Sequence, residues 1–457
     1  MERNLRNLDL FARVRIKPVE SVESPGKTNL EVNTFDRLSI VASAGGSFLG
    51  GIGEVEFSVG DKNLLGLGHE LQFGYSENTE GELLGSVSYD NILIQDRDVF
   101  AGFKAGETEE GNFGEINVRD RFQHHLDNRA WNVRLQHETT RQDFFEQGET
   151  VAEVPRRRDS LRVDRLWRQG HRLSYFRFGP VLTATRNEFD AAIGPQADSI
   201  EIPEDNSAIF VGALVASDRA REFRTVTGIN SLSFEQDVTL GTNVEVALGL
   251  EQDQRPTGTR ILPTVFLRGG ARNAIGAHNY LNFGIGSSVQ WDDSNLESWS
   301  ISTAATWFNR RLTNQTIAAR IIYESAFDAT GLPPTQRLGE DNGLRGYPAR
   351  QFNAEQSLLI NMEYRRTTRF NLLSLELGVL GFADAGWVAD RAGSRSLSNL
   401  LEEPITSAGV GIRIGSPQLL GSTVIRMDFA YPFFRVDGEE FSPTFSLAVG
   451  HVFDFRP

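Results

Sequence analysis

The feature that most constrains this chain is an alternation of apolar and polar side chains with a period of two. It recurs in runs of roughly ten residues from about residue 36 onward, separated by short stretches rich in Gly, Asn, Asp and Pro. In segment 371–387 the odd positions from 373 to 379 are Leu or Val, whereas Glu376 and Asp384 are at even positions. Segment 354–366 repeats the pattern in the opposite parity. Because successive side chains of a strand point to opposite faces, the pattern predicts strands with one apolar and one polar face.

Two architectures could bury such strands, and the run length favours one of them. No window holds eighteen consecutive apolar residues, which excludes a helical membrane protein. A soluble sandwich or propeller expects shorter strands or a fixed repeat. Runs of about ten residues suit a closed antiparallel transmembrane β-barrel, and the periodicity supports an even number of strands between about sixteen and twenty. The last expected strand, 441–455, places these residues on one face: Phe441, Phe445, Leu447, Val449, Phe453 and Phe455.

Composition excludes several classes of function. The formal net charge of −15 argues against nucleic-acid binding, which uses basic surfaces. The chain has no Cys, and its seven His residues are scattered without metal-ligand spacing. Phosphate-binding loops and nucleophile elbows are also absent from the sequence. We therefore expect no enzymatic activity, no metal and no cofactor, although a Ser–His or Asp–His site at the barrel rim stays open as an alternative.

The N-terminal residues are polar and amphipathic, and they contain no apolar core of a signal peptide. Either the chain is cytoplasmic, or it is part of a longer protein whose leader and upstream domain are not included. The barrel pattern of the remaining sequence favours the second interpretation.

Three motifs then follow one another along the second half of the chain. A loop in segment 338–365 carries an Arg-Gly-Tyr tip and leads into a strand with an Asn-x-Glu pattern, and the next strand carries Phe-x-Asp-x-Gly. The residues are Arg345, Gly346, Tyr347, Asn361, Glu363, Phe382, Asp384 and Gly386. Together they resemble the BamA/TamA/FhaC superfamily of outer-membrane assembly and secretion barrels, also called the bacterial surface antigen family.

The ends of the expected barrel extend this resemblance. Segment 60–73, with Gly66 and Gly68, is similar to the family's turn between its second and third strands. The C-terminal Gly450-His-Val-Phe453-Asp-Phe455 is similar to the β-signal of outer-membrane barrels. The resemblance implies about 16 strands, with eleven before the Arg-Gly-Tyr loop and five after it. A larger barrel of 18–20 strands is the alternative, because more strand segments than eleven can be marked before the loop.

Residues 1–36 resemble the second half of a POTRA module, the periplasmic domain that precedes such barrels. Its last helix would be Arg3–Phe11, and its last strands would be Ala12–Val22 and Thr28–Phe35. A short N-terminal helix that plugs or caps the barrel is the alternative. The resulting domain division is 1–36 for the POTRA-like half and 37–457 for the barrel.

The charges of the motifs have a physical explanation of their own. By parity, Glu363 and Asp384 lie on the polar faces of adjacent strands, where two carboxylates repel unless a cation lies between them. Arg345 is flanked by Gly343 and Gly346, which permit a sharp turn, and its guanidinium can pair with a carboxylate in bidentate geometry. The family resemblance likewise implies that Arg345 folds into the lumen and pairs with Asp384. The alternative is that all three are solvated loop and lumen charges.

The expected function is the energy-independent insertion or translocation of other proteins at a Gram-negative outer membrane. The first strand, about Arg37–Ser47, carries Gly45 and Gly46, which weaken its pairing with the last strand, so that this junction could open and template an incoming strand. The alternatives are a dedicated two-partner secretion pore, and a passive barrel that anchored an upstream domain. The expected partners are the outer-membrane bilayer and unfolded or partly folded client proteins; accessory periplasmic or lipoprotein subunits are compatible with this role.

Overall fold

The computed structural model describes most of the chain. The described residues are 11–20, 28–36, 39–79, 83–91, 99–108, 111–120, 122, 127–146, 149–171, 173–233, 236–293, 295–328, 336–372, 375–389, 401, 404–416, 424–433, 435–436, 439–440 and 442–453. The expected helix before Phe11 therefore lies outside them. No helix in this described part is long and apolar enough to span a membrane.

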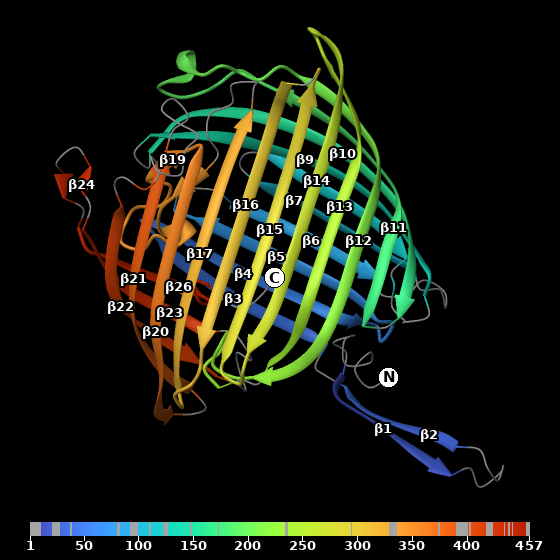
Figure 1. The fold of residues 1–457 in the computed structure, drawn as a ribbon, viewed down its shortest axis with the longest axis vertical. Coiled ribbons are helices and arrows are strands. Elements are labelled where there is room, and N and C mark those ends of the chain that lie inside the picture. Colours follow the sequence, from blue (N-terminus) through green and yellow to red (C-terminus); the bar gives the residue numbers. More distant parts are fainter. Residues whose placement is uncertain are drawn as a thin grey trace.

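Within the described residues, twenty antiparallel strands form one closed barrel (Figure 1). Its strands up to the long loop are β3 (Ile40–Leu49), β4 (Ile52–Leu64), β5 (His69–Asn78), β6 (Leu83–Asn91), β7 (Val99–Thr108), β8 (Gly111–Asp120), β9 (Arg129–Glu146), β10 (Glu149–His171), β11 (Ser174–Phe189), β12 (Asn206–Val226), β13 (Gln236–Arg255), β14 (Gly258–Ile275), β15 (Asn279–Asp292), β16 (Asn295–Asn309) and β17 (Gln315–Asp328). The strands after the loop are β20 (Gln356–Leu372), β21 (Leu375–Ala389), β22 (Ile405–Gly415), β23 (Val424–Pro432) and β26 (Thr444–Val449).

The remaining short elements are not part of the barrel sheet. Hairpin β1 (Phe11–Glu20) and β2 (Thr28–Asp36) projects from one end of the barrel (Figure 1). In the described part, two one-turn 3-10 helices, η1 (Ala197–Ser199) and η2 (Glu340–Asn342), lie in loops. The same part holds two small sheets: β18 (Gln336–Leu338) with β19 (Phe352–Ala354), and β24 (Arg435–Val436) with β25 (Glu439–Glu440). The hairpin agrees with the two expected strands of the N-terminal unit, whereas the POTRA assignment stays a prediction.

The strand number matches the larger of the two predicted sizes. Among the described strands of the barrel, five follow the long loop, as the family resemblance implies, but fifteen precede it instead of eleven. The 16-strand expectation is therefore wrong, and the additional strands lie before the loop. Alternation within one strand specifies its two faces but not how many strands must be added before the sheet closes.

Side chains on the barrel wall follow the predicted parity. On β20, Met362 and Tyr364 point outward with 53% and 46% exposed surface, whereas Asn361 and Glu363 are buried. The outward faces of β4 and β5 likewise expose large apolar side chains, including Phe57 and Phe73. An apolar exterior with charges enclosed inside is the reverse of a soluble protein and fits a barrel whose solvent is lipid.

We expect the purified chain to require detergent or lipid and to be heat-modifiable, with unboiled barrel migrating differently from boiled chain on a denaturing gel. The reason is that exposed apolar strands need a nonpolar solvent, while the closed ladder resists unfolding without heat. Far-UV circular dichroism dominated by helix, or a soluble monomer without detergent, would contradict the barrel.

Candidate functional site

The long loop between β17 and β20 is a folded element that enters the lumen. Its two ends pair as β18 and β19, and the tip between them turns at two glycines with positive φ, +100° at Gly343 and +95° at Gly346. A Cβ atom on Gly346 would lie 3.3 Å from the Cβ of Ala430 on β23. Glycine is therefore needed at position 346 for two reasons: it adopts the positive φ, and its lack of a side chain lets the loop approach the barrel wall closely.

Arg345 at this tip is fully buried and binds both predicted carboxylates. Its Nε and Nη2 donate to Oδ2 and Oδ1 of Asp384 at 2.7 and 2.8 Å, and its Nη1 donates to Oε1 of Glu363 at 2.7 Å. Its guanidinium also lies 3.5 Å from the ring centroid of Phe382. The predicted contact is thus present, and the alternative of solvated charges is wrong. The functional role of these residues stays a prediction.

The other motif residues hold the loop in place around Arg345. Tyr347 is buried, and its hydroxyl donates to the main-chain oxygen of Thr406 at 2.7 Å. Asn361 donates to Asp384 Oδ1 at 2.7 Å and to the main-chain oxygen of Gly343 at 2.8 Å. At Gly386, an added Cβ would lie 3.1 Å from a methyl group of Leu338, so this glycine leaves room for the loop.

The ion-pair network is larger than the sequence motifs indicated. Arg365 Nε donates to Glu363 Oε2 at 2.6 Å, and Arg413 binds Asp428 through Nη1 and Nη2 at 2.6 and 3.1 Å. Asp428 lies 3.8 Å from Arg345 Nη1, so it joins the two pairs. The three motifs did not indicate Arg365, Arg413 and Asp428, because these residues belong to none of the motifs. The sequence feature that could have found them is a charged residue at a position of the strand whose side chain faces the lumen.

The loop also contacts the first hairpin of the barrel, which no sequence pattern indicated. The amide of Gly50, in the turn between β3 and β4, donates to Oε2 of Glu340 at 3.2 Å, and the Gly50 carbonyl accepts from the Ala349 amide at 3.0 Å. Glu340 is 1% exposed, and burial raises the pKa of its carboxyl. The loop therefore links the wall formed by β20 and β21 to the hairpin that starts the barrel.

The junction between the first and last strands, here called the seam, is short. Within the described residues β26 and β3 share one paired position, Leu447 opposite Phe48, whereas β23 and β26 share six and all other neighbours share more. The seam is thus the junction with the fewest paired positions among the described strands, which agrees with the predicted weak pairing of the first and last strands. Gly45 and Gly46 lie in β3, where they pair with Glu56 and Val55 of β4.

The C-terminal residues correct one expectation. The last strand does not continue to residue 455: β26 ends at Val449, and Gly450 follows with φ of +93°. Phe453 is buried in a cluster with Phe308, so it does not lie on the lipid-facing surface. Phe441 and Phe455 lie outside the described residues. Local alternation could not reveal this change of direction, because the partners of Phe453 come from distant strands.

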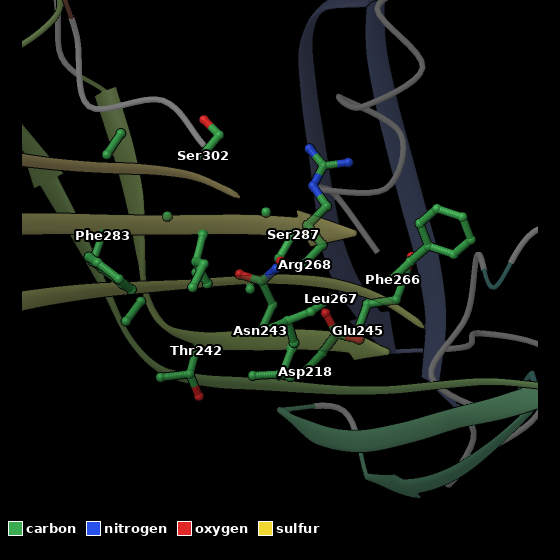
Figure 2. A pocket seen from close by; sticks show the side chains of 18 of the residues that line it. Asp218, Thr242, Asn243, Glu245, Phe266, Leu267, Arg268, Phe283, Ser287 and Ser302 are labelled. Carbon is green, nitrogen blue, oxygen red and sulfur yellow. The ribbon is translucent and has the colours of Figure 1, made fainter. Parts of the chain in front are cut away.

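A cavity of about 1600 Å³ lies beside these residues, along the wall formed by β10 to β16. Figure 2 shows part of its lining, with Glu245 and Arg268 on neighbouring strands. Arg177 lies between two carboxylates of the lining, 2.9 Å from Asp218 and 3.8 Å from Glu245. Charges of both signs therefore line the open part of the lumen.

Comparison with protein families agrees with this geometry. Residues 278–453 match the family model described as the Omp85 superfamily domain, and no curated protein matches the chain. BamA from Haemophilus ducreyi lacking POTRA domains 1–3 is similar over 98% of this chain and 77% of its own, with 10% identity and a TM-score of 0.48. CdiB from Escherichia coli is similar over 98% and 70%, with 10% identity and a TM-score of 0.44. The copper transporter OprC is similar over 96% and 78%, with 12% identity and a TM-score of 0.45.

Proposed function

We propose that the barrel assists the insertion or translocation of client proteins at the outer membrane, because residues 278–453 match the family model described as the Omp85 superfamily domain. We place the barrel in an outer membrane of the Gram-negative type, where that superfamily works with client proteins. The proposed role is not enzymatic and needs no nucleotide. The proposed interaction consists of main-chain hydrogen bonds between a client strand and an open strand edge of the barrel.

The observation that carries this proposal is the seam. Only Phe48 of β3 has a partner on β26 within the described residues, so the preceding part of β3, from Ile40 to Ser47, has a ladder on its β4 side alone. An unpaired strand edge presents rows of N–H and C=O groups that can bind an incoming strand. The geometry thus supports client strands that add to β3 before release into the bilayer.

The buried network supports the same role by stiffening one side of the seam. Arg345 ties the loop to β20 and β21, while Arg413 and Asp428 tie β22 to β23. Opening should therefore occur between β26 and β3, where the described residues share one paired position, and it should also break the hydrogen bonds that Gly50 makes with Glu340 and Ala349 of the loop. The ties restrict movement of the adjacent wall, so the gate can open without loss of the barrel.

A second candidate is secretion of a dedicated partner through the lumen. The cavity along β10 to β16 favours this route, because it leaves part of the lumen unfilled. A passive barrel that anchors another domain is the third, and it predicts no dependence on the seam at all. Locking the seam distinguishes the first candidate from both others.

We expect a disulfide across the seam to stop client assembly. Ser47→Cys and Ala448→Cys place two thiols at opposite positions in the register set by Leu447 and Phe48, and the chain has no other Cys. Oxidised barrel reconstituted in vesicles should fail to assemble an outer-membrane client, and reductant should restore assembly, because only the oxidised seam cannot open.

The control is a disulfide elsewhere on the wall. Ser288 and Ser300 are opposite each other on β15 and β16, with their hydroxyl oxygens 2.7 Å apart, so Ser288→Cys with Ser300→Cys locks a junction that is already fully paired. This pair should leave assembly unchanged. Normal assembly by the oxidised seam variant would reject lateral opening and favour the lumen route or the passive barrel.

A further inference from the structure

The hairpin formed by β12 and β13 extends beyond the strands that flank it. On one side β11 pairs with β12 only as far as Arg219, and on the other side β14 pairs with β13 only from Gly241 onward. Beyond these points β12 and β13 still pair with each other, over residues 222–226 and 236–240. Residues 222–233 and 236–240, here called the arm, therefore form no ladder with a neighbouring strand in the described part of the chain.

The arm bends away from the direction of the wall. A β-bulge interrupts the register between Ala220 and Glu222, where the arm begins, and bulges bend the strand that contains them. Figure 1 shows the end of β12, in green, turning sideways at the lower edge of the barrel. Because neighbouring strands alternate in direction, β12, the tenth strand counted from β3, ends at the mouth where β3 starts. This end of the barrel is here called the N-terminal mouth.

The arm fills the N-terminal mouth with an apolar cluster inside the lumen. On the wall, Phe308 of β16 and Ala318 of β17 are 0% exposed, whereas Ile317, which points outward, is 39% exposed. The arm contributes four residues to the same cluster, and all of them are buried: Val226, Ile229, Val238 and Leu240. Apolar side chains packed in this way exclude water, so the lumen is closed between the arm and these two strands.

The tip of the arm reaches a distant part of the wall. A Cβ atom on Gly378 of β21 would lie 2.8 Å from Cδ2 of Leu232, and one on Gly415 of β22 would lie 3.4 Å from its Cγ. Ser233 Oγ donates to Oε1 of Glu376 on β21. Strands β14 to β17 and β20 separate β13 from β21 along the wall. The arm therefore crosses the lumen instead of following the wall.

Side chains of the wall hold the turn of the arm. Thr316 Oγ1 on β17 donates to the Gly228 carbonyl at 2.8 Å, and Arg365 Nη1 on β20 donates to the Ile229 carbonyl at 2.9 Å. These contacts fix the docked position, but none of them belongs to a strand ladder. The arm can thus leave the mouth without breaking the pairing that closes the barrel.

The arm is also one end of the lumen cavity. Phe223 and Thr239 of the arm line the cavity of about 1600 Å³ together with Arg268 and Arg272 of β14. The cavity is therefore bounded by the arm on the side of the N-terminal mouth. An ion or a chain segment that entered the cavity from this mouth would have to pass the arm.

We propose that the arm is a releasable plug of the N-terminal mouth, the end at which the POTRA-like unit is expected. The docked arm closes the lumen cavity toward this mouth, and the released arm connects the two. A docked plug keeps the barrel tight to ions while clients use the seam, whereas a client that takes the lumen route must displace it. The inference is independent of which route of the proposed function is correct.

The test is the ionic conductance of the full-length barrel in planar bilayers without any client. Replacing residues 221–240 by Asn-Gly removes the arm and joins Ala220 to Gly241, which are already opposite each other, through a two-residue hairpin turn. This variant should conduct several-fold more than the unmodified barrel, because one end of the cavity is removed. Ile229→Ser should also raise the conductance, because it places a hydroxyl in the apolar cluster and favours release of the arm.

A disulfide that holds the tip should reverse the effect of Ile229→Ser. Leu232→Cys with Gly415→Cys joins the arm to β22, where the Cγ of Leu232 is close enough to the expected Cβ for such a bond. In the Ile229→Ser background, oxidation of this pair should return the conductance to that of the unmodified barrel, and reductant should raise it again. A purely structural role of the arm predicts no such dependence on the redox state.

The matched control is Leu67→Ser in the turn between β4 and β5, which lies at the same mouth but is 63% exposed. It should leave the conductance unchanged, and heat-modifiability verifies that each variant forms the barrel. Equal conductance with and without the arm, or equal effects of Ile229→Ser and Leu67→Ser, would overturn the proposal. The readout involves neither a client nor the seam, so this result and the seam-lock result can fail separately.

Discussion

Replacing Arg345 with alanine should destabilise the barrel by about 3 kcal/mol, near the lower end of the roughly 3–5 kcal/mol seen when one partner of a buried ion pair is removed. The structure identifies Asp384 as the carboxylate that would be left without a charged partner. Glu363 keeps Arg365 as a partner, whereas the hydrogen bond left to Asp384 among the described residues comes from the amide of Asn361. Because Asp384 is 3% exposed, water cannot replace the lost guanidinium. The measurement is the free energy of unfolding by urea in detergent, followed by heat-modifiability.

Two variants determine whether charge is the cause. Arg350→Ala removes a half-buried arginine from the same loop and should cost about 1 kcal/mol or less, as most substitutions outside a buried network do. Combining Arg345→Leu with Asp384→Asn removes both charges and should recover part of the loss. Equal tolerance of Arg345→Ala and Arg350→Ala would mean that the loop is not held by this pair.

The second large effect is expected at the turn between β3 and β4. A Cβ atom on Gly50 would lie 2.1 Å from the main-chain nitrogen of Ala349, and Gly50 has φ of +58°. Gly50→Ala must therefore displace either the loop or the first hairpin, with loss of the hydrogen bonds to Glu340 and Ala349. We expect a cost of about 2–4 kcal/mol, from roughly 1 kcal/mol of backbone strain plus roughly 1–3 kcal/mol of overpacking.

The adjacent residue is a matched control. Gly51 also has a positive φ, +94°, but an added Cβ there meets nothing within 4 Å in the described part of the chain. Gly51→Ala should therefore show the backbone cost alone, about 1 kcal/mol. Unfolding by urea gives both costs, and limited proteolysis tests whether the loop has been released. If the two variants are equally stable, the contact between loop and hairpin contributes nothing to the fold.

Features that depend on neighbours along the chain could be predicted from the order of the residues. The period of two specifies which residues of β20 and β21 face the lumen, so alternation alone places Glu363 and Asp384 on adjacent strands with their side chains on the same face. The glycines around Arg345 predict a sharply turned tip for the same reason, since φ is a local property. From these two facts a charge contact inside the lumen follows, and it is present.

The way in which distant segments meet depends on long-range packing, which local patterns do not specify. Twenty described strands close the barrel, Glu340 reaches Gly50, and Phe453 turns into a pocket made by Phe308 and Ile229. The alternation around Phe453 suits a strand, yet the residue lies in the lumen, because packing and hydrogen bonds with remote residues outweigh the local pattern. A period of two specifies the faces of a strand, whereas closure, loop docking and the direction of the chain end depend on partners that spacing along the sequence does not encode.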